Sequence, residues 1–392
     1  MSKLYSIEIL DKSLNKITEI INPYPLGNNG HILRFSNELS HYGMATFRVS
    51  TKDTIFDQFG DIVEPHKYHV RIRRQGKVVW QGAIIDNPVR NKIFIEVVCA
   101  EYLFYFDKKR VQRDASQPTG WTGSTTGWQN YRYFASGTMA TAVTNVITEM
   151  KAGFGSNHIL ANMTIGTVEN PQYPNNFSKS DGTALTGDWN FTSDIIMQFD
   201  YHTVLHVLKS FGNVSNMDFE LTNDLVFNFK KFIGTARLDT GFTYGTFGNI
   251  VDYNVPRLGK RMVNDMYGLA ADDIGNAIRF QETDSVSINT YGLLEGSNAY
   301  LDITNANVLH NRLAEELRFL KTPNTAPVNV ILDDKTYALG TWKIGDVVHV
   351  KIKDNVIDYD ANRRIVGITT TVHNTGKELV AVQTNQPREG LF

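Results

Sequence analysis

Hydrophobic and polar positions alternate along the first hundred residues in the manner of β-strands. The alternating runs occupy residues 5–9, 17–21, 44–50, 70–74, 77–80 and 92–99. In the third run Ala45, Phe47 and Val49 fall on one side of the strand, which predicts one buried face. The fourth and fifth runs flank Gln75-Gly76, a pair suited to a hairpin turn. Short strands at this spacing predict a small antiparallel barrel or sandwich.

Three later segments show the periodicity of an amphipathic helix. They occupy residues 139–150, 201–211 and 307–321. We expect the first to begin behind a Thr138 cap and to stop at Gly153. The second should begin behind Asp200 and end at Gly212, and the third should stop before Pro323.

Strand-like runs return after the second helix. They occupy residues 217–221, 225–229, 328–332, 347–352, 365–372 and 379–383. Residues 117–128 are instead rich in Gly, Ser and Thr, and residues 155–195 in Asn, Gly, Pro and Ser, so we place a first boundary near residue 112. The pattern predicts a mainly β protein with α+β insertions, in which barrel-like segments begin and end the chain.

Composition narrows the classes of function. The 392 residues are 42% hydrophobic and 20% charged, which supports buried cores in two or three compact units. A formal net charge of -2 excludes a globally basic nucleic-acid binder. The single cysteine, Cys99, allows no intramolecular disulfide, so we expect a reducing folding compartment. Neither a signal-peptide pattern nor an apolar run near the roughly 20 residues of a membrane span is found.

An ordered series of short motifs runs through nearly the whole chain. The motifs are Trp80-Gln81-Gly82, residues 102–110, Thr203-Val204-Leu205, Phe219-Glu220, residues 226–229, residues 284–288 ahead of Tyr291-Gly292, and residues 343–348. In this order they resemble the tail-tip or baseplate hub family of tailed bacteriophages, a family shared with the hubs of contractile injection systems.

The resemblance implies two small antiparallel β-barrel tube domains with inserted modules. The first tube domain would be residues 1–112, and the second would combine residues 200–250 with residues 325–392. A loop-rich module with one helix would occupy residues 113–199, and an α/β module residues 251–324. Members of the family are trimers, whose six barrels form a pseudo-sixfold ring that continues the tail tube.

The function that this resemblance implies is structural. The ring would join the tail tube to the tip or receptor-binding apparatus and act as a conduit for DNA ejection. The implied partners are further copies of the chain in a homotrimer, the tail tube or distal tail protein, the tape measure protein, and tip or receptor-binding proteins. DNA would contact the lumen only transiently, and the chain would be a virion component made in the host cytoplasm, without stable membrane insertion.

Two pairs of histidines have a spacing that could suit a metal site. His202 and His206 fall on one face of a predicted helix, but the glutamate of a zinc-protease motif is missing between them. His66 and His69 are more simply explained as surface histidines beside Lys67. We therefore predict no metal and no cofactor.

Catalytic nucleophiles and carboxylate pairs are equally unsupported. Cys99 lies on an apolar strand face, where an inert buried thiol is expected, and no serine sits in a Gly-x-Ser-x-Gly motif. Asp272-Asp273 and Asp333-Asp334 are adjacent in sequence, so their side chains point apart more often than they converge. The sequence predicts a protein that is not an enzyme.

Aromatic residues punctuate the Gly- and Thr-rich stretch. Trp121, Trp128 and Tyr131 could stack on a sugar ring or on a partner protein, and the alternative is a loop held in place by its own aromatic side chains. Together with the acidic turns, they favour an alternative function: a virion-attached or secreted β-protein that binds or cleaves cell-wall glycan.

Positive charge gathers in residues 66–113, which hold 11 Lys and Arg against 4 Asp and Glu. Arg71 and Arg73 alternate on the polar face of one predicted strand. A solvated exterior explains them, as does a contact with an acidic neighbouring subunit, and a lumen lining that touches passing DNA is a third interpretation. We predict that Arg71 and Arg73 belong to a subunit interface, because charge complementarity fixes register between non-identical surfaces.

Overall fold

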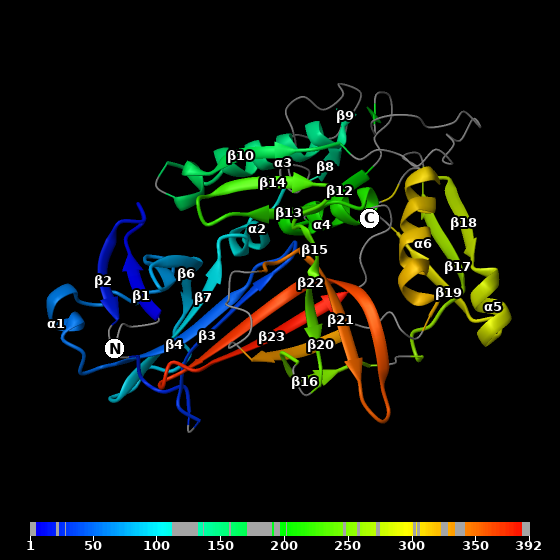
Figure 1. The fold of residues 1–392 in the computed structure, drawn as a ribbon. Helices are drawn as coiled ribbons and strands as arrows, with labels where there is room; N and C mark the ends of the chain where they lie inside the picture. The colour runs from blue at the N-terminus through cyan, green and yellow to red at the C-terminus, as the bar shows by residue number, and fades with distance from the viewer. Residues whose placement is uncertain are drawn as a thin grey trace.

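The computed structural model describes residues 5–20, 23–27, 29–111, 132–135, 137–156, 158–170, 190–191, 197–200, 202–245, 248–256, 259–271, 275–300, 303, 306–322, 328–333 and 342–385. Strands dominate these residues, so the prediction of a mainly β protein with α+β insertions is confirmed (Figure 1). Three hydrophobic clusters lie within this architecture.

Thirteen of the described strands form one large sheet. They are β1 (Tyr5–Leu10), β2 (Lys16–Ile20), β3 (His31–Glu38), β4 (Met44–Ser50), β5 (His69–Arg74), β6 (Lys77–Asp86), β7 (Phe94–Glu101), β15 (Ala236–Thr243), β16 (Ile250–Asn254), β20 (Val328–Asp333), β21 (Val347–Lys353), β22 (Asp358–His373) and β23 (Glu378–Asn385). Their order is β16-β20-β23-β22-β3-β4-β7-β6-β5-β1-β2, and β21 pairs with both β22 and β15.

The two expected barrels are not closed in the described part of the chain, which corrects the prediction from the resemblance. The reason lies in β22, which pairs with β21 through residues 358–364 and with β3 through residues 367–373. The C-terminal half of β22 is therefore hydrogen-bonded to β3, a strand from the first part of the chain. One cluster of buried side chains, which includes Phe47 and Trp80, packs against the early strands, and another, which includes Val350, packs against the late strands.

A layer of helices and short strands lies beside the large sheet (Figure 1). It contains α2 (Phe104–Lys108), α3 (Met139–Ala152), a 3-10 helix (Ile159–Asn162), α4 (Val204–Ser215), and a sheet ordered β10 (Thr164–Val168), β14 (Val226–Lys230), β13 (Asp218–Leu221). Two small pairs join β8 (Arg132–Ala135) to β12 (Met197–Asp200) and β9 (Gly137–Thr138) to β11 (Asn190–Phe191). The third hydrophobic cluster fills this layer. A separate short helix, α1 (Ile55–Phe59), follows β4.

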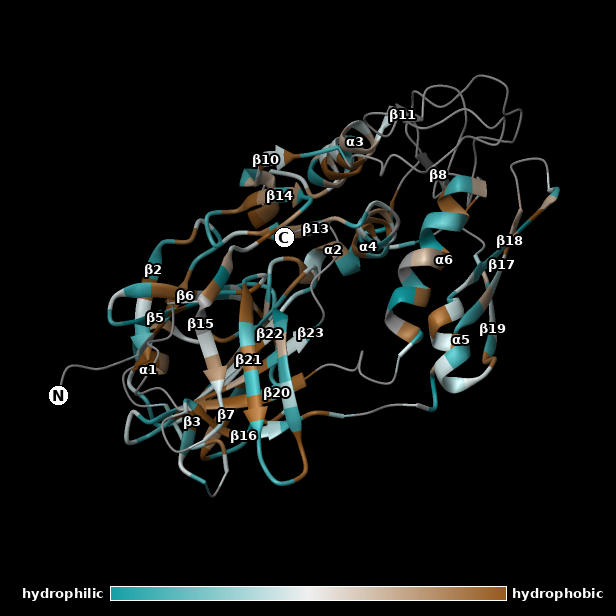
Figure 2. Ribbon diagram, turned by 45° about the vertical axis from the view of Figure 1, so that its right-hand side comes forward, coloured by the Kyte–Doolittle hydropathy of each residue, from teal (hydrophilic) through white to brown (hydrophobic). Residues whose placement is uncertain are grey.

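A further small sheet stands at the other side of the molecule, ordered β18 (Ala277–Thr283), β17 (Asp265–Ala271), β19 (Glu295–Ala299), with helices α5 (Ser285–Tyr291) and α6 (Ala306–Leu320) (Figures 1 and 2). Helix α6 covers the face that carries Met266 and Gly268. A Cβ on Gly268 would lie 2.6 Å from Cδ1 of Leu313, so the glycine permits this close packing. The opposite face exposes Tyr267 and Leu269.

Most predicted elements are confirmed within one to three residues. The early hairpins form as β1–β2 and β5–β6, and the strand predicted at residues 44–50 is β4. Helix α3 begins behind Thr138, whose hydroxyl accepts a hydrogen bond from the backbone N–H of Thr141, and Gly153 caps its end. Helix α6 matches the third predicted helix.

The bounds predicted for the second helix are wrong at both ends. Helix α4 begins behind Thr203, whose hydroxyl accepts a hydrogen bond from His206 N–H, while Asp200 belongs to β12. It passes through Gly212 and ends at Asn216, which has the left-handed conformation. Gly212 has a different role: a Cβ there would lie 2.7 Å from the carbonyl oxygen of Met217.

Candidate interaction site

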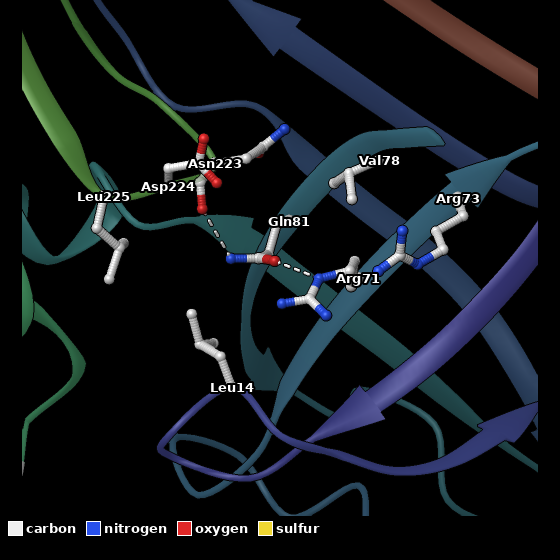
Figure 3. A pocket seen from close by; sticks show the side chains of 8 residues that line it. All are labelled: Leu14, Arg71, Arg73, Val78, Gln81, Asn223, Asp224 and Leu225. Carbon is white, nitrogen blue, oxygen red and sulfur yellow. Dashed lines mark hydrogen bonds between the residues drawn. The ribbon is translucent and has the colours of Figure 1, made fainter. Parts of the chain in front are cut away.

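A cavity of about 600 Å³ opens where two turns meet the polar face of the large sheet (Figure 3). The β1–β2 turn forms one wall, β5 and β6 form the floor, and the β13–β14 turn forms the opposite wall. The lining residues are Leu14, Arg71, Arg73, Val78, Gln81, Asn223, Asp224 and Leu225.

Strand alternation explains why both predicted arginines reach this cavity. In β5, Ile72 points into the hydrophobic cluster, so Arg71 and Arg73 point to the opposite face. Arg71 pairs in register with Glu8 of β1 and with Gln81 of β6. The structure therefore places Arg71 and Arg73 together, and Arg71 lies in a row with Glu8 and Gln81.

The cationic side chains at the floor of the cavity lie close to the nearly buried carboxylate of Glu8. Arg73 Nε lies 3.1 Å from Glu8 Oε2, Arg71 Nη1 lies 3.6 Å from the same oxygen, and Lys16 Nζ lies 3.6 Å from Oε1. The side chains of Arg71 and Arg73 are only 18% and 31% exposed, so they are half-buried rather than freely solvated strand charges. Lys16 also pairs with Glu19 at 2.9 Å, so Glu8 is left mainly to the two guanidiniums, which together can accept a further negative charge.

A hydrogen-bond chain fixes the position of the Arg71 guanidinium. Arg71 Nε donates to Gln81 Oε1 at 2.6 Å, and Gln81 Nε2 donates to the carbonyl oxygen of Asn223 at 3.1 Å (Figure 3). The chain ties the large sheet to the β13–β14 turn. Because Gln81 uses its oxygen for the arginine and its nitrogen for the turn, the amide orientation is determined by its partners.

Two leucines in the walls have backbone conformations that side chains rarely adopt. Leu14 has φ 65° and Leu225 has φ 59°, both in the left-handed region. Each closes a tight turn, since Leu14 N–H donates to Asp11 O at 3.0 Å and Leu225 N–H donates to Thr222 O at 2.9 Å. Glycine or asparagine would fit these positions with less strain. Leu225 is buried in the hydrophobic cluster of the neighbouring layer and Leu14 packs against that cluster, so core packing holds both turns in these conformations.

The lining residues suit binding rather than catalysis. Two guanidinium groups, one carboxylate and two side-chain amides line the cavity together with Leu14, Val78 and Leu225. Such a surface matches a peptide segment with a small apolar side chain next to opposite charges.

The two histidine pairs considered as metal ligands have different surroundings in the structure. His202 precedes the Thr203 cap and His206 lies in the first turn of α4, so the prediction of both on one helix is wrong, although their rings stack with centroids 4.3 Å apart. No group of three potential metal ligands occurs within the residues that the structure describes. His66 is exposed, but His69 is buried, which corrects its interpretation as a surface residue. Burial is also the main reason that the pKa of His69 is lowered to about 4.

The remaining candidate residues are Cys99, the three aromatic residues and the aspartate pairs. Cys99 is buried, as predicted, and burial raises the pKa of its thiol. Trp121, Trp128 and Tyr131 lie outside the described residues. So do Asp272-Asp273 and Asp334, the last of which follows the final residue of β20. Along the described parts of the chain, no helix combines the length and the apolar character needed to cross a membrane.

Sequence reasoning missed four contributors to the cavity: Glu8, Gln81, Leu14 and the turn at residues 223–225. Glu8 could have been found, because it is the polar position between Ile7 and Ile9 in the alternating run of residues 5–9. The two turns come from distant parts of the chain, and nothing in their local sequence indicates that they approach β5.

The fold is that of bacteriophage tail proteins, so the predicted resemblance is confirmed at the level of fold. The tail protein from Neisseria meningitidis MC58 is 11% identical, with a TM-score of 0.61 over 99% of this chain and 97% of that chain. The 43 kDa tail protein of prophage MuSo2 from Shewanella oneidensis is 12% identical, with a TM-score of 0.60 over 97% and 98%.

Prophage tail protein gp18 from Listeria monocytogenes EGD-e is 10% identical, with a TM-score of 0.55 over 98% of this chain and 95% of that chain. No protein-family model and no curated protein sequence matches this chain.

Proposed function

We propose that this chain is a non-enzymatic structural hub of a phage tail tip or baseplate. In this proposal three copies form a pseudo-sixfold ring that continues the tail tube, joins it to the tip or receptor-binding apparatus, and lets DNA pass during ejection. The tail tube or distal tail protein, the tape measure protein and the tip proteins are the partners. The chain is then a virion component made in the host cytoplasm.

The observation that carries the proposal is the fold likeness to three tail proteins over nearly the full length of both chains. Shared architecture over the full length supports a shared structural role more strongly than a match to one domain, although function lives in sites rather than folds. The division into two tube domains and two inserted modules is part of the proposal. The β3–β22 pairing is then the junction that holds the two tube domains of one copy together.

We also propose that Arg71 and Arg73 belong to the interface between copies. The half-buried guanidiniums, their shared carboxylate and the cavity in front of them support this role over that of a solvated exterior. The glycan-binding alternative depends on Trp121, Trp128 and Tyr131, so no described contact favours it.

Electron microscopy of the intact particle tests the proposed function most directly. We expect density for three copies in a ring at the end of the tail tube. Light scattering on the purified chain adds the mass of any assembly formed without partners. A chain that is absent from the tail, or that occupies a peripheral fibre as a monomer, contradicts the proposal.

A further inference from the structure

The tip of the β21–β22 hairpin presents an apolar side chain to solvent. Val356 is 89% exposed at this tip. The turn around it is held rigidly, because Asp354 Oδ1 accepts hydrogen bonds from the backbone N–H groups of Val356 at 2.7 Å and Ile357 at 2.6 Å. Asp354 N–H also donates to Ile357 O at 2.9 Å. An exposed valine on a preorganised turn loses little entropy when a partner covers it.

Opposite charges flank this valine. Lys353 and Asp358 pair in register, with Lys353 Nζ 3.4 Å from Asp358 Oδ2, and their side chains are 70% and 72% exposed. A pair so exposed contributes little to the stability of the hairpin. Both groups are therefore available to a second surface.

The hairpin tip and the cavity lie at different ends of the molecule (Figures 1 and 2). The cavity borders β1, β5 and β6 near one end of the large sheet, and β21 branches from β22 in the other half. The tip of one copy does not fill the cavity of the same copy. Contact between the two surfaces would be heterologous, which is the kind of contact that closes a ring.

We propose that the cavity binds the β21–β22 tip, residues 353–358, of a second copy of this chain. Val356 packs against Leu14 and Val78, the two half-buried apolar residues of the lining. Asp358 faces the guanidiniums of Arg71 and Arg73, which share the single carboxylate of Glu8. This inference rests on the proposed ring and names the contact that builds it.

Lys353 completes the match, because Asp224 lines the cavity wall opposite the arginines (Figure 3). Each surface thus offers an apolar centre and both signs of charge. Reversing the orientation of the tip would place like charges together, so the same residues select one register.

Disulfide trapping tests the contact in the full-length chain. Val356→Cys on one copy is mixed with Val78→Cys on another and oxidised with copper phenanthroline. Native Cys99 is buried and does not compete. The matched control pairs Val356→Cys with Val286→Cys, because Val286 is another exposed apolar residue, 74% accessible on α5. We expect at least a tenfold higher yield of cross-linked chains from the cavity pair.

The possible results separate this inference from the proposed function. Rings without a cross-link above control would overturn the contact and leave the hub proposal standing. A chain that stays monomeric at high concentration, shows no cross-link and is absent from tail tips contradicts both. Equal trapping by both pairs would mean random collision and also counts against the contact.

A second variant removes the apolar contact with little change to the fold. Leu14→Asn keeps a residue that tolerates the left-handed backbone. We expect about a tenfold weaker self-association with an unchanged circular dichroism spectrum. Val286→Asn serves as its control and should leave association unchanged. Normal association of the Leu14→Asn chain would show that the cavity wall does not receive a partner.

Discussion

A buried ion pair joins the early and late strands of the large sheet, and breaking it should destabilise the whole chain. Arg74 Nε lies 2.6 Å from Glu378 Oε1, and Arg74 Nη2 lies 3.0 Å from Oε2. The side chains are 12% and 0% exposed. Arg74→Met keeps an unbranched apolar stem but removes the guanidinium, which leaves the Glu378 carboxylate buried without its cation.

Removing one partner of such a pair costs about 3 to 5 kcal/mol, because the remaining charge stays out of water. Unfolding entropy is about 2.1 cal/mol/K per residue. Over 392 residues, a loss of about 4 kcal/mol therefore lowers the melting temperature by about 5 °C for cooperative unfolding. Glu378→Leu added to Arg74→Met should recover most of this loss, since a hydrophobic pair of similar volume is often neutral.

Differential scanning calorimetry of the wild type, both single variants and the double variant gives the coupling energy. Arg90→Met is the matched control, because Arg90 Nη1 lies 2.7 Å from Asp61 Oδ2 in a pair whose side chains are 52% and 36% exposed. That change should cost less than about 1 kcal/mol. The reasoning fails if Arg74→Met is as mild as Arg90→Met, or if the double variant is no more stable than Arg74→Met alone.

Burial raises the pKa of Glu101 to about 7, so the folded state holds a proton that the unfolded chain releases near pH 4.5. This group therefore makes stability fall as pH rises from about 4.5 to 7, and urea unfolding should show that Glu101→Gln removes this part of the pH dependence. Gly43→Ala should cost more than about 3 kcal/mol, or prevent soluble expression, because its Cβ would lie 1.8 Å from the carbonyl oxygen of Ser36. The double change of His202 and His206 to Ala should leave metal content unchanged by plasma mass spectrometry, and a stoichiometric metal lost in the variant would contradict this.

Most of the secondary structure could be predicted from short stretches of the sequence. The β5–β6 hairpin follows from Gln75-Gly76 between two runs of β-branched residues, and Gln75 indeed takes φ 48° in that turn. Helix α3 follows from the threonine cap and the apolar stripe, because both act within a few residues. The cap of α4 was predicted wrongly, because Asp200 has a side chain suited to capping and its pairing within β12 and β8 cannot be seen in the local sequence.

Non-local pairings could not be predicted in this way. The junction of β3 with β22 brings together His31 and His373, which are far apart along the chain. The alternation of each strand predicts a buried face but not its neighbour, so two closed barrels and one continuous sheet agree equally with the sequence. The cavity has the same origin, because strand alternation predicts the direction of Arg71 and Arg73 but not the turns that approach them.

Buried ionic contacts determine how the large sheet and the β13–β14 layer are arranged. The hydrophobic pattern of the sequence does not predict such contacts. Arg364 of the large sheet bonds Asp218 at the start of β13, and it also donates to the carbonyl oxygens of Ile233 at 2.9 Å and Gly345 at 3.2 Å. Charged residues are ordinarily assigned to the surface from sequence, so such a contact is invisible there. A buried pair is often no more stabilising than an apolar pair of the same volume. Its consequence here is geometric: directional bonds to three partners hold β13, and with it the β13–β14 turn, at one position over the polar face of the sheet. That turn supplies one wall of the cavity, so the orientation of the proposed docking site depends on an ion pair outside it.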